Sequence, residues 1–477
     1  MVDLIISHGT VITMDPQRRV IEDGSLAIEG GRILGVGTTA EIEDRYGADR
    51  VIDASKMVVM PGLMDGHSHA GHGLIKSLGM HNGLWYQACD KVYAEGSTEG
   101  FWEAEARLTA LERLKFGVTC SLTFFGGGDS VMRTDDPVYG DRHLESVRDV
   151  GIREFLAVGP RRPPFPRRYS RWVGDAKEDY DVSFEGMLET SETLIRRWNG
   201  EADGRIGVSM MFPTAHPEQR EFTPSELEDL KYRAGAARDL SRKHGVLFTQ
   251  DGHTKGTVKF AHEELNLLGS DALLSHSTDL TDEEIELCKR TDTRIVHNPS
   301  AVASMTARCP VPELLNSGVT VILGSDASAP DRSFDMFRHM FQCMRYHRRH
   351  YRDSRVLPPG KVLEMATIDA ARALGVGGEL GSLEPGKKAD VILVDAYKPH
   401  IYPLNMAVDR VAYYANGNDV DTVIVNGEVL MEGRAVNTVD EAEVLDAAQE
   451  EIDAAIDRND LRHLIDYTPG YWGRSRY

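Results

Sequence analysis

The stretch that decides the fold is Met60-Pro61-Gly62-Leu63-Met64-Asp65-Gly66-His67-Ser68-His69. It continues an apolar run and carries two histidines at i and i+2, and side chains with this spacing on an extended chain point to the same side. Both imidazoles can therefore reach one metal ion, at the ~2.0–2.1 Å typical of a zinc–nitrogen bond. The stretch predicts a strand that ends at a metal site.

Downstream, short apolar strands alternate with longer helical segments, a pattern typical of βαβ units and a parallel sheet. Helices with a period of 3.6 residues are expected at Phe101–Lys115, Ser225–His244 and Asp282–Thr291. Eight strands are expected, enough to close a barrel: Val58–Leu63, Val118–Phe124, Arg153–Ala157, Ile206–Met211, Val246–Thr249, Ala272–Ser275, Arg294–His297 and Thr320–Leu323. The predicted fold class is α/β, with a TIM-like (β/α)₈ barrel over residues 61–379.

The two ends of the chain have a different sequence pattern. Residues 1–60 and 380–435 contain short alternating β-like runs separated by turns, among them the hairpin signal Asn426-Gly427. Each half is too short to bury a sheet alone, so we expect both to form one composite β-sandwich domain. Residues 436–477 are acidic and helical, and this extension is expected to pack on the barrel or on a partner subunit.

Composition narrows the possible partners and the compartment. The formal net charge of −21 argues against a nucleic-acid partner, because phosphate binding needs a basic surface. No apolar stretch is long enough to span a membrane, and the N-terminus lacks the features of a signal peptide. The five cysteines are scattered and form no CxxC pair, which fits a reducing compartment. We therefore expect a cytoplasmic protein with a small-molecule substrate.

Residues of metal-binding type also stand where later strands end. His276 ends one strand, His297 ends the next, and Asp326 closely follows the last. The carboxyl ends of barrel strands meet at one mouth, whatever their separation in sequence. We expect these three side chains to converge with His67 and His69.

The chain resembles the amidohydrolase superfamily, in the branch that holds cytosine, guanine and adenosylhomocysteine deaminases and the triazine hydrolases. The resemblance implies a divalent metal ion, bound by His67, His69 and Asp326. It implies that Asp326 takes a proton from the attacking water, that His276 binds the metal or orients that water, and that His297 lies near the substrate. Relatives commonly assemble, so a homo-oligomer is expected. The motifs that carry the resemblance are PGLMDGHSH, LLSHSTDLTDEE, VHNPSAVASM, PVPELLNSGVTVILGSDAS and GSLEPGKKADVILVD.

The fifth barrel strand departs from the family pattern. The family usually has a metal-binding histidine there, followed three residues later by a proton-shuttling glutamate, but this chain has Gln250 and His253. Gln250 can offer a metal only a neutral carbonyl oxygen, whereas His253 has an ordinary pKa near ~6.5 and can transfer protons. Either Gln250 binds a single metal, or His253 is the ligand and Gln250 only hydrogen-bonds. The fourth strand, Ile206–Met211, also lacks the lysine that, when carboxylated, bridges two metals in other branches, so we expect one divalent metal ion per chain.

The missing His–Glu pair and the stretch Gly71–Gly79 (GHGLIKSLG) resemble the bacterial phenylurea and molinate hydrolases. This reading predicts cleavage of an amide, urea or carbamate-like C–N bond in a small uncharged xenobiotic, with His72 facing the pocket. Zinc suits the donor set, although cobalt, iron or manganese also binds such a set. The alternative is a deaminase or dechlorinase of an N-heteroaromatic ring, a nucleobase or a triazine. A non-catalytic scaffold is disfavoured, because the histidines and Asp326 are all retained.

Overall fold

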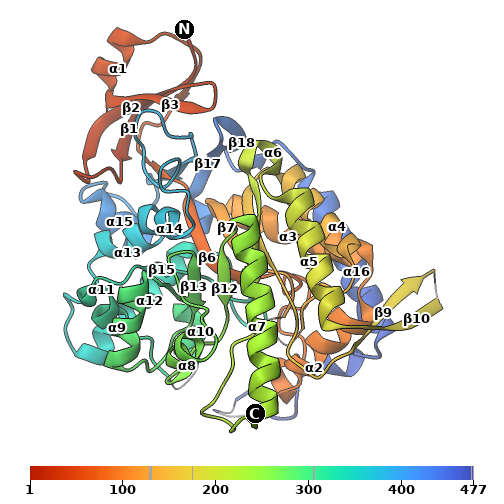
Figure 1. The fold of residues 1–477 in the computed structure, drawn as a ribbon. Helices are drawn as coiled ribbons and strands as arrows, with labels where there is room; N and C mark the ends of the chain where they lie inside the picture. Colours follow the sequence, from red (N-terminus) through yellow and green to blue (C-terminus); the bar gives the residue numbers. More distant parts are fainter. Residues whose placement is uncertain (128–130, 175, 305–306, 474, 476–477) are drawn as a thin grey trace.

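The computed structural model describes residues 1–127, 131–174, 176–304, 307–473 and 475. Two sheets organise the molecule: an eight-stranded parallel barrel and a nine-stranded sheet built from both ends of the chain. In Figure 1 the second sheet stands beside the barrel, with the N-terminus at its outer end. Among the described residues, no helix combines the length and the apolar character needed to cross a bilayer.

The barrel confirms the predicted fold class. Neighbouring strands pair in parallel from the first strand of the barrel to the eighth. An isolated parallel bridge between Ser68 and Asp326 joins the first strand to the chain after the last, and the Asp326 amide donates to the His67 carbonyl oxygen at 2.8 Å. The strands are β6 (Leu63–His69), β7 (Val118–Phe124), β8 (Arg153–Val158), β11 (Ile206–Met211), β12 (Phe248–Gln250), β13 (Ala272–Ser275), β14 (Arg294–His297) and β15 (Val321–Leu323).

Helices cover the outside of the barrel (Figure 1). The three predicted helices are present, and their ends follow from local chemistry. For example, α7 begins with a capping box between Thr223 and Glu226 and ends at Gly245, whose φ of 63° suits a residue without Cβ. The principal helices are α3 (Glu99–Lys115), α4 (Pro137–Val150), α5 (Phe184–Trp198), α7 (Pro224–His244), α8 (Thr257–Glu263), α9 (Asp282–Thr291), α10 (Pro299–Ser304), α11 (Val311–Ser317), α12 (Met336–Tyr351), α13 (Pro359–Met365) and α14 (Ile368–Ala373).

The second sheet confirms that both ends of the chain combine. Strand β5 pairs in parallel with β1 and antiparallel with β16, and so joins the two halves. The predicted hairpin is present between β17 and β18, where Asn426 and Gly427 have φ of 50° and 79°. The strands are β1 (Val2–Ile12), β2 (Val20–Glu29), β3 (Arg32–Thr38), β4 (Ala48–Asp53), β5 (Met57–Pro61), β16 (Val391–Asp395), β17 (Val420–Val425), β18 (Glu428–Glu432) and β19 (Ala435–Val436).

The start of the barrel differs from the prediction. The expected first strand, Val58–Leu63, is divided at Gly62: β5 belongs to the end sheet, and the barrel begins with β6. A Cβ on Gly62 would lie 2.1 Å from the Thr119 hydroxyl oxygen, so only glycine fits at this junction. The run reads as one strand because both halves are buried and apolar.

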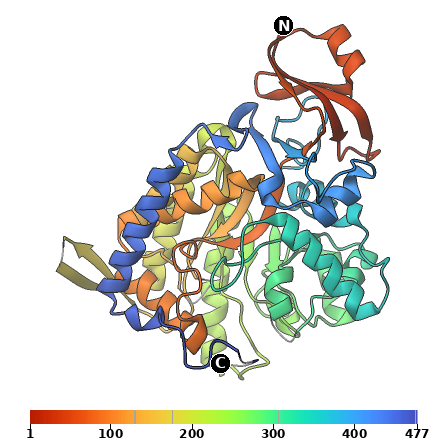
Figure 2. The ribbon, with the colours of Figure 1, turned by 180° about the vertical axis from the view of Figure 1, so that it is seen from behind.

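The C-terminal helix α16 (Glu441–Arg458) packs against α3, alongside the first helices of the barrel (Figure 2). Thr98 donates to Glu451 at 3.3 Å, Lys115 pairs with Glu441 at 2.6 Å, and Arg458 donates to the Gly96 carbonyl oxygen at 3.0 Å. This helix therefore contacts the barrel directly. The three-part division at residues 61, 380 and 436 stays a prediction.

Candidate metal centre

Four of the residues singled out in the sequence meet at the mouth of the barrel. His67 and His69 lie at the end of β6, His276 follows β13, and Asp326 follows β15. The Oδ1 atom of Asp326 lies 3.7 Å from His67 Nε2, 3.2 Å from His69 Nε2 and 3.9 Å from His276 Nε2. The barrel thus assembles three imidazoles around one carboxylate.

A second carboxylate, Asp251, completes the cluster, and the sequence reasoning missed it. Its Oδ1 atom lies 3.3 Å from His67 Nε2 and 3.2 Å from His276 Nε2, and its Oδ2 atom lies 3.6 Å from His69 Nε2. The Ser275 hydroxyl donates to Oδ1 at 2.6 Å and so helps to fix the carboxylate. The signal in the sequence was an acidic residue directly after the strand that lacks the family's histidine.

The donor set fits a divalent transition metal. Two groups of three residues each place one ligand atom per residue within 4.8 Å of the others. One group is His67, His69 and Asp251, and the other is His67, His276 and Asp326. Neither ring nitrogen of the buried His67 makes a hydrogen bond to a described residue, although such groups normally find a partner. Imidazole nitrogens with carboxylate oxygens are typical ligands of zinc.

Hydrogen bonding orients His69 for such a role. The Nδ1 atom of His69 lies 3.0 Å from the carbonyl oxygen of Gly126. Since a carbonyl only accepts, Nδ1 carries the proton, and the lone pair of Nε2 faces the carboxylates. Phe124 packs against both imidazoles of β6, with ring centroids 4.8 Å from His67 and 5.4 Å from His69.

The electrostatics of the cluster favour a positive charge. Burial alone would lower the pKa of His67, but Asp251 and Asp326 outweigh it and raise that pKa to about 9. Burial opposes ionisation of the two carboxyls, yet the surrounding imidazoles hold the pKa of each well below its usual range. Both carboxylates are therefore ionised, as ligands of a divalent cation must be.

Arg332 is a second residue that the sequence reasoning missed. Its Nη1 atom lies 3.5 Å from Asp326 Oδ2, on the carboxylate oxygen that does not face the histidines. The same atom donates to the carbonyl oxygens of Ala327 and Ala329 at 3.4 and 3.3 Å. A fixed guanidinium in this place helps to keep Asp326 ionised.

Gln250 and His253, the two predicted residues of the fifth strand, lie on either side of Asp251. The Gln250 amide nitrogen donates to the carbonyl oxygens of Phe212 and Pro213 at 3.4 and 3.5 Å, and its buried Oε1 has no partner among the described residues. Gln250 as a metal ligand stays a prediction. The prediction placed the neutral oxygen of Gln250 at the metal, whereas in the structure the next residue, Asp251, brings a charged oxygen to the cluster.

The proton position on His253 follows from its partner. The Thr257 hydroxyl donates to the Thr254 carbonyl oxygen at 2.7 Å and therefore accepts from His253 Nδ1, at 2.9 Å. Burial lowers the pKa of His253 to about 3, so the ring is neutral at pH 7. Its Nε2 atom is then a bare acceptor, with no partner among the described residues.

The two predicted substrate contacts have different surroundings. His72 is buried beside the cluster, with ring centroids 5.6 Å from His69 and 5.4 Å from Trp85. His297 instead contacts His347 of α12, with 3.4 Å between their Nε2 atoms. Contact with substrate stays a prediction for both.

Comparisons with known proteins agree with this geometry. The amidohydrolase family model matches residues 58–430, so the chain belongs to that family. It is 32% identical over 453 residues to a 5′-deoxyadenosine deaminase of Methanosarcina acetivorans, covering 94% of this chain and 97% of the relative. A 5-methylthioadenosine/S-adenosylhomocysteine deaminase of Syntrophobacter fumaroxidans is 30% identical, over 93% of this chain and 96% of its own. The protein is thus a hydrolase that acts on carbon–nitrogen bonds other than peptide bonds.

Solved structures share the fold. An adenosine deaminase from Xanthomonas campestris with bound zinc superposes with a TM-score of 0.80 at 22% identity, over 95% of this chain and 98% of that one. The zinc complex of an atrazine chlorohydrolase from Arthrobacter aurescens gives 0.76 at 21% identity, over 94% and 100%. At these identities the likeness concerns the architecture alone.

Proposed function

We propose that the protein is a metal-dependent deaminase that replaces the exocyclic amino group of an aminopurine nucleoside by oxygen and releases ammonia. The observation that carries the proposal is the cluster at the barrel mouth, in a chain aligned over nine-tenths of its length with deaminases of adenosine derivatives. The ion is proposed to be zinc, because the similar solved structures hold zinc and the donor set suits it. Its ligands would come from His67, His69, His276, Asp251 and Asp326.

The residues of the cluster would divide the chemistry among them. When bound, the metal lowers the pKa of a water ligand from about 15.7 toward about 7. Asp326 is ionised and lies beside Arg332, so it takes a first proton from the attacking water and later a second from the hydroxyl that has added to the ring carbon, and it delivers the second to the departing amine. The Nε2 atom of His276 lies 3.4 Å from the side-chain Nδ2 of Asn298. His276 orients the water toward the ring carbon.

The end of β12 and the segment that follows it contain two residues that could recognise the substrate. Gln250 Oε1 and His253 Nε2 are buried acceptors without a partner among the described residues, so a substrate that offers N–H groups would satisfy them. His253 is neutral and holds its proton on Nδ1, so it cannot protonate a ring nitrogen through Nε2. That proton would be the first one that Asp326 accepts from water, and the second goes to the amine.

A second candidate function follows from the same segment. No carboxylic acid stands at residue 253, and hydrolysis of a urea or carbamate needs no ring protonation. A phenylurea also offers an N–H to the buried acceptors. This reading predicts release of an arylamine rather than ammonia.

The deciding experiment measures both products from the zinc-loaded enzyme. Ammonia is assayed with 5′-deoxyadenosine and 5-methylthioadenosine, and arylamine with a phenylurea, each beside an Asp326→Asn variant as the inactive control. Ammonia from a nucleoside, abolished in the variant, supports the deaminase. Arylamine alone favours the second candidate, and no product from zinc-loaded protein contradicts both.

A further inference from the structure

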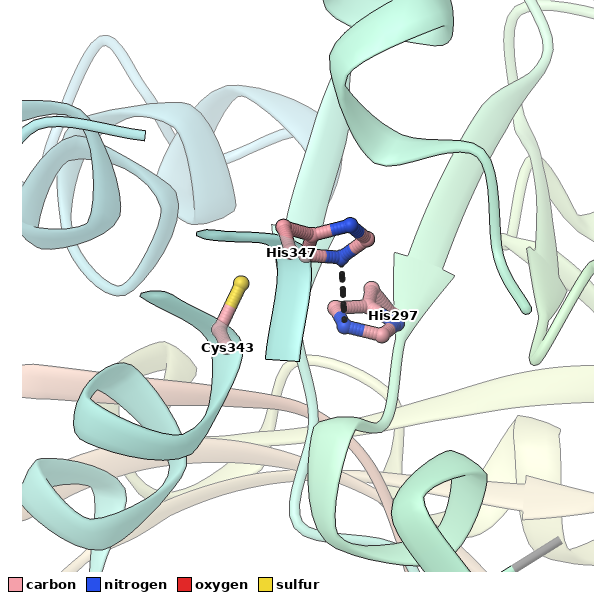
Figure 3. Close-up of side chains that lie close together, drawn as sticks. All are labelled: His297, Cys343 and His347. Carbon is pink, nitrogen blue, oxygen red and sulfur yellow. Dashed lines mark hydrogen bonds between the residues drawn. The ribbon is translucent and has the colours of Figure 1, made fainter. Parts of the chain in front are cut away.

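A second group of metal-binding side chains lies between β14 and α12. His297 ends β14, while Cys343 and His347 stand one turn apart on α12, a spacing that places both on the same side of a helix. Figure 3 shows the Cys343 sulfur beside the two imidazoles, whose ring planes are tilted by 60°. One ligand atom from each residue lies within 4.8 Å of the others, and all three side chains are fully buried.

Hydrogen bonding leaves part of this group unexplained. The only bond drawn between its members joins the two Nε2 atoms, at 3.4 Å. The Nδ1 atoms of His297 and His347 are buried and have no partner among the described residues. Burying a polar nitrogen without a partner is unfavourable, and a bound ion is one way to avoid that loss.

The group is in the right state to bind a metal. Burial, assisted by nearby Arg308, lowers the pKa of His347 to about 3, and burial lowers that of His297 well below its ordinary value. Both imidazoles are therefore neutral and keep a lone pair. Cys343 is a free thiol whose pKa is raised by burial, so it is protonated without a metal and would lose its proton to solvent only as its sulfur bonds to the ion.

We propose that His297, Cys343 and His347 form a second metal site, distinct from the histidine and carboxylate cluster. Thiolate with imidazole selects a borderline-soft transition metal such as Zn²⁺ and disfavours Mg²⁺ or Ca²⁺, which prefer oxygen. The ion would tie a barrel strand to the helix that follows the last strand. It would also make His297 a ligand rather than a substrate contact.

Cobalt distinguishes the two centres, because only a thiolate ligand gives a sulfur-to-cobalt charge-transfer band. The full chain is produced with Co²⁺ as the supplied metal, and its absorption spectrum and cobalt content per chain are measured. We expect the band in the unmodified protein and its loss in Cys343→Ser, together with loss of one cobalt per chain. Cys288→Ser, at an equally buried thiol on α9, is the matched control and should retain both.

The proposal is overturned if the unmodified protein shows no such band, or if the band persists in Cys343→Ser. The five clustered residues of the first centre include no sulfur ligand. If the proposed function or the first metal centre is wrong, the cobalt content therefore changes but the sulfur-to-cobalt band does not. If Cys343→Ser does not fold, His347→Gln decides the matter. An altered band in that variant supports the site, and an unchanged one rejects it.

Discussion

At the scale of single residues, Asp251 offers the sharpest test of the metal centre. Asp251→Asn keeps the size of the side chain but removes the charge that faces His67 and His276. We expect zinc affinity to fall by roughly 10–100-fold or more, since even outer-shell partners of a metal contribute that much. Competition against a chromophoric chelator measures the change.

Gln250→Met is the matched control for that variant, because it alters the neighbouring residue at similar volume. Affinity near that of the unmodified protein would assign the ligand of this segment to Asp251. The opposite pattern, with the loss in Gln250→Met alone, would return the role to the glutamine.

A second residue-scale prediction concerns the proton donor. The double variant Gln250→His, His253→Glu installs the histidine and glutamate that the family usually carries. A carboxylic acid can protonate a ring nitrogen, and general acid catalysis contributes ~10²–10⁴-fold. We expect kcat for ammonia release from 5′-deoxyadenosine to rise by at least ~10-fold, with His253→Glu alone as the control. An unchanged or lower rate would mean that the present acceptors already serve this reaction.

The sequence placed His67, His69, His276 and Asp326 at one mouth because each lies at or just after the end of a predicted strand, and the carboxyl ends of barrel strands converge. The role of Asp251 was not predicted, because this residue lies one position beyond β12, where the chain turns at Gly252 with φ of 81°. Side chains alternate only while the strand lasts, so spacing from its start does not tell which neighbouring residue reaches the mouth.

At the scale of elements, Glu192 links two helices. Its Oε1 atom lies 2.7 Å from Lys243 Nζ and 2.9 Å from His244 Nε2, joining α5 to the end of α7. Hydrogen bonds from these two residues lower the pKa of Glu192 from 4.5 to about 2. The stabilisation is therefore full above pH ~4.5 and disappears as the pH falls toward 2.

Glu192→Gln should accordingly lower the free energy of unfolding at pH 7 by up to about 1 kcal/mol, the range of an exposed ion pair. The difference from the unmodified protein should shrink as the pH falls below 4.5. Urea unfolding at several pH values measures it, and Glu189→Gln, at an exposed position of the same helix, controls for the loss of charge. A difference that does not change with pH contradicts the assignment.

Gly62 connects the end sheet to the strand that carries His67 and His69. Gly62→Ala would place a methyl group 2.1 Å from the Thr119 hydroxyl oxygen and 2.8 Å from its Cβ, so no rotation of Thr119 relieves the clash. We expect a loss of about 1–3 kcal/mol or more in unfolding free energy, and lower zinc content.

Gly235→Ala provides the control for that variant. This glycine lies inside α7 with no atom within 4 Å of the added carbon, and alanine there should be neutral or stabilising by up to about 1 kcal/mol. Equal stability of the two alanine variants would show that the junction tolerates a side chain.

The eight barrel strands could be predicted because each is a short apolar run bounded by turn residues. The first was misplaced because β5 and β6 form one continuous apolar run, and only the contact of Gly62 with Thr119 divides them. The hairpin of β9 (Arg167–Val173) and β10 (Ala176–Val182) was not predicted, since its strands are charged and largely exposed. Two of its arginines, Arg168 and Arg171, pair with acids across the hairpin.

At the scale of the whole molecule, the metal should stabilise the fold, because its candidate ligands come from four separate strands of the barrel. Zinc at 100 times its dissociation constant would add about 2.7 kcal/mol to the stability of the native state. We expect chelation to lower Tm by at least ~2 °C and added zinc to restore it, as measured by calorimetry. Asp326→Asn should respond less, because only the proposed site at His297, Cys343 and His347 then remains, and an equal response would mean that the first centre does not contribute.

The arrangement of the whole chain was predictable in outline, because alternating β-like runs at both ends lacked the length for separate sheets. What spacing alone did not provide is the pairing, in which β5 brings β1 and β16 together. The domain boundaries and the expected homo-oligomer stay predictions.

The bridge between Ser68 and Asp326 has a consequence for how the protein is made. His67 and His69 leave the ribosome long before Asp326, so a growing chain presents two imidazoles on an open sheet whose last strand does not yet exist. The carboxylate arrives with the same residue that closes the barrel. Ring closure and completion of the ligand set are therefore one event, and a chain that ends before residue 326 has neither.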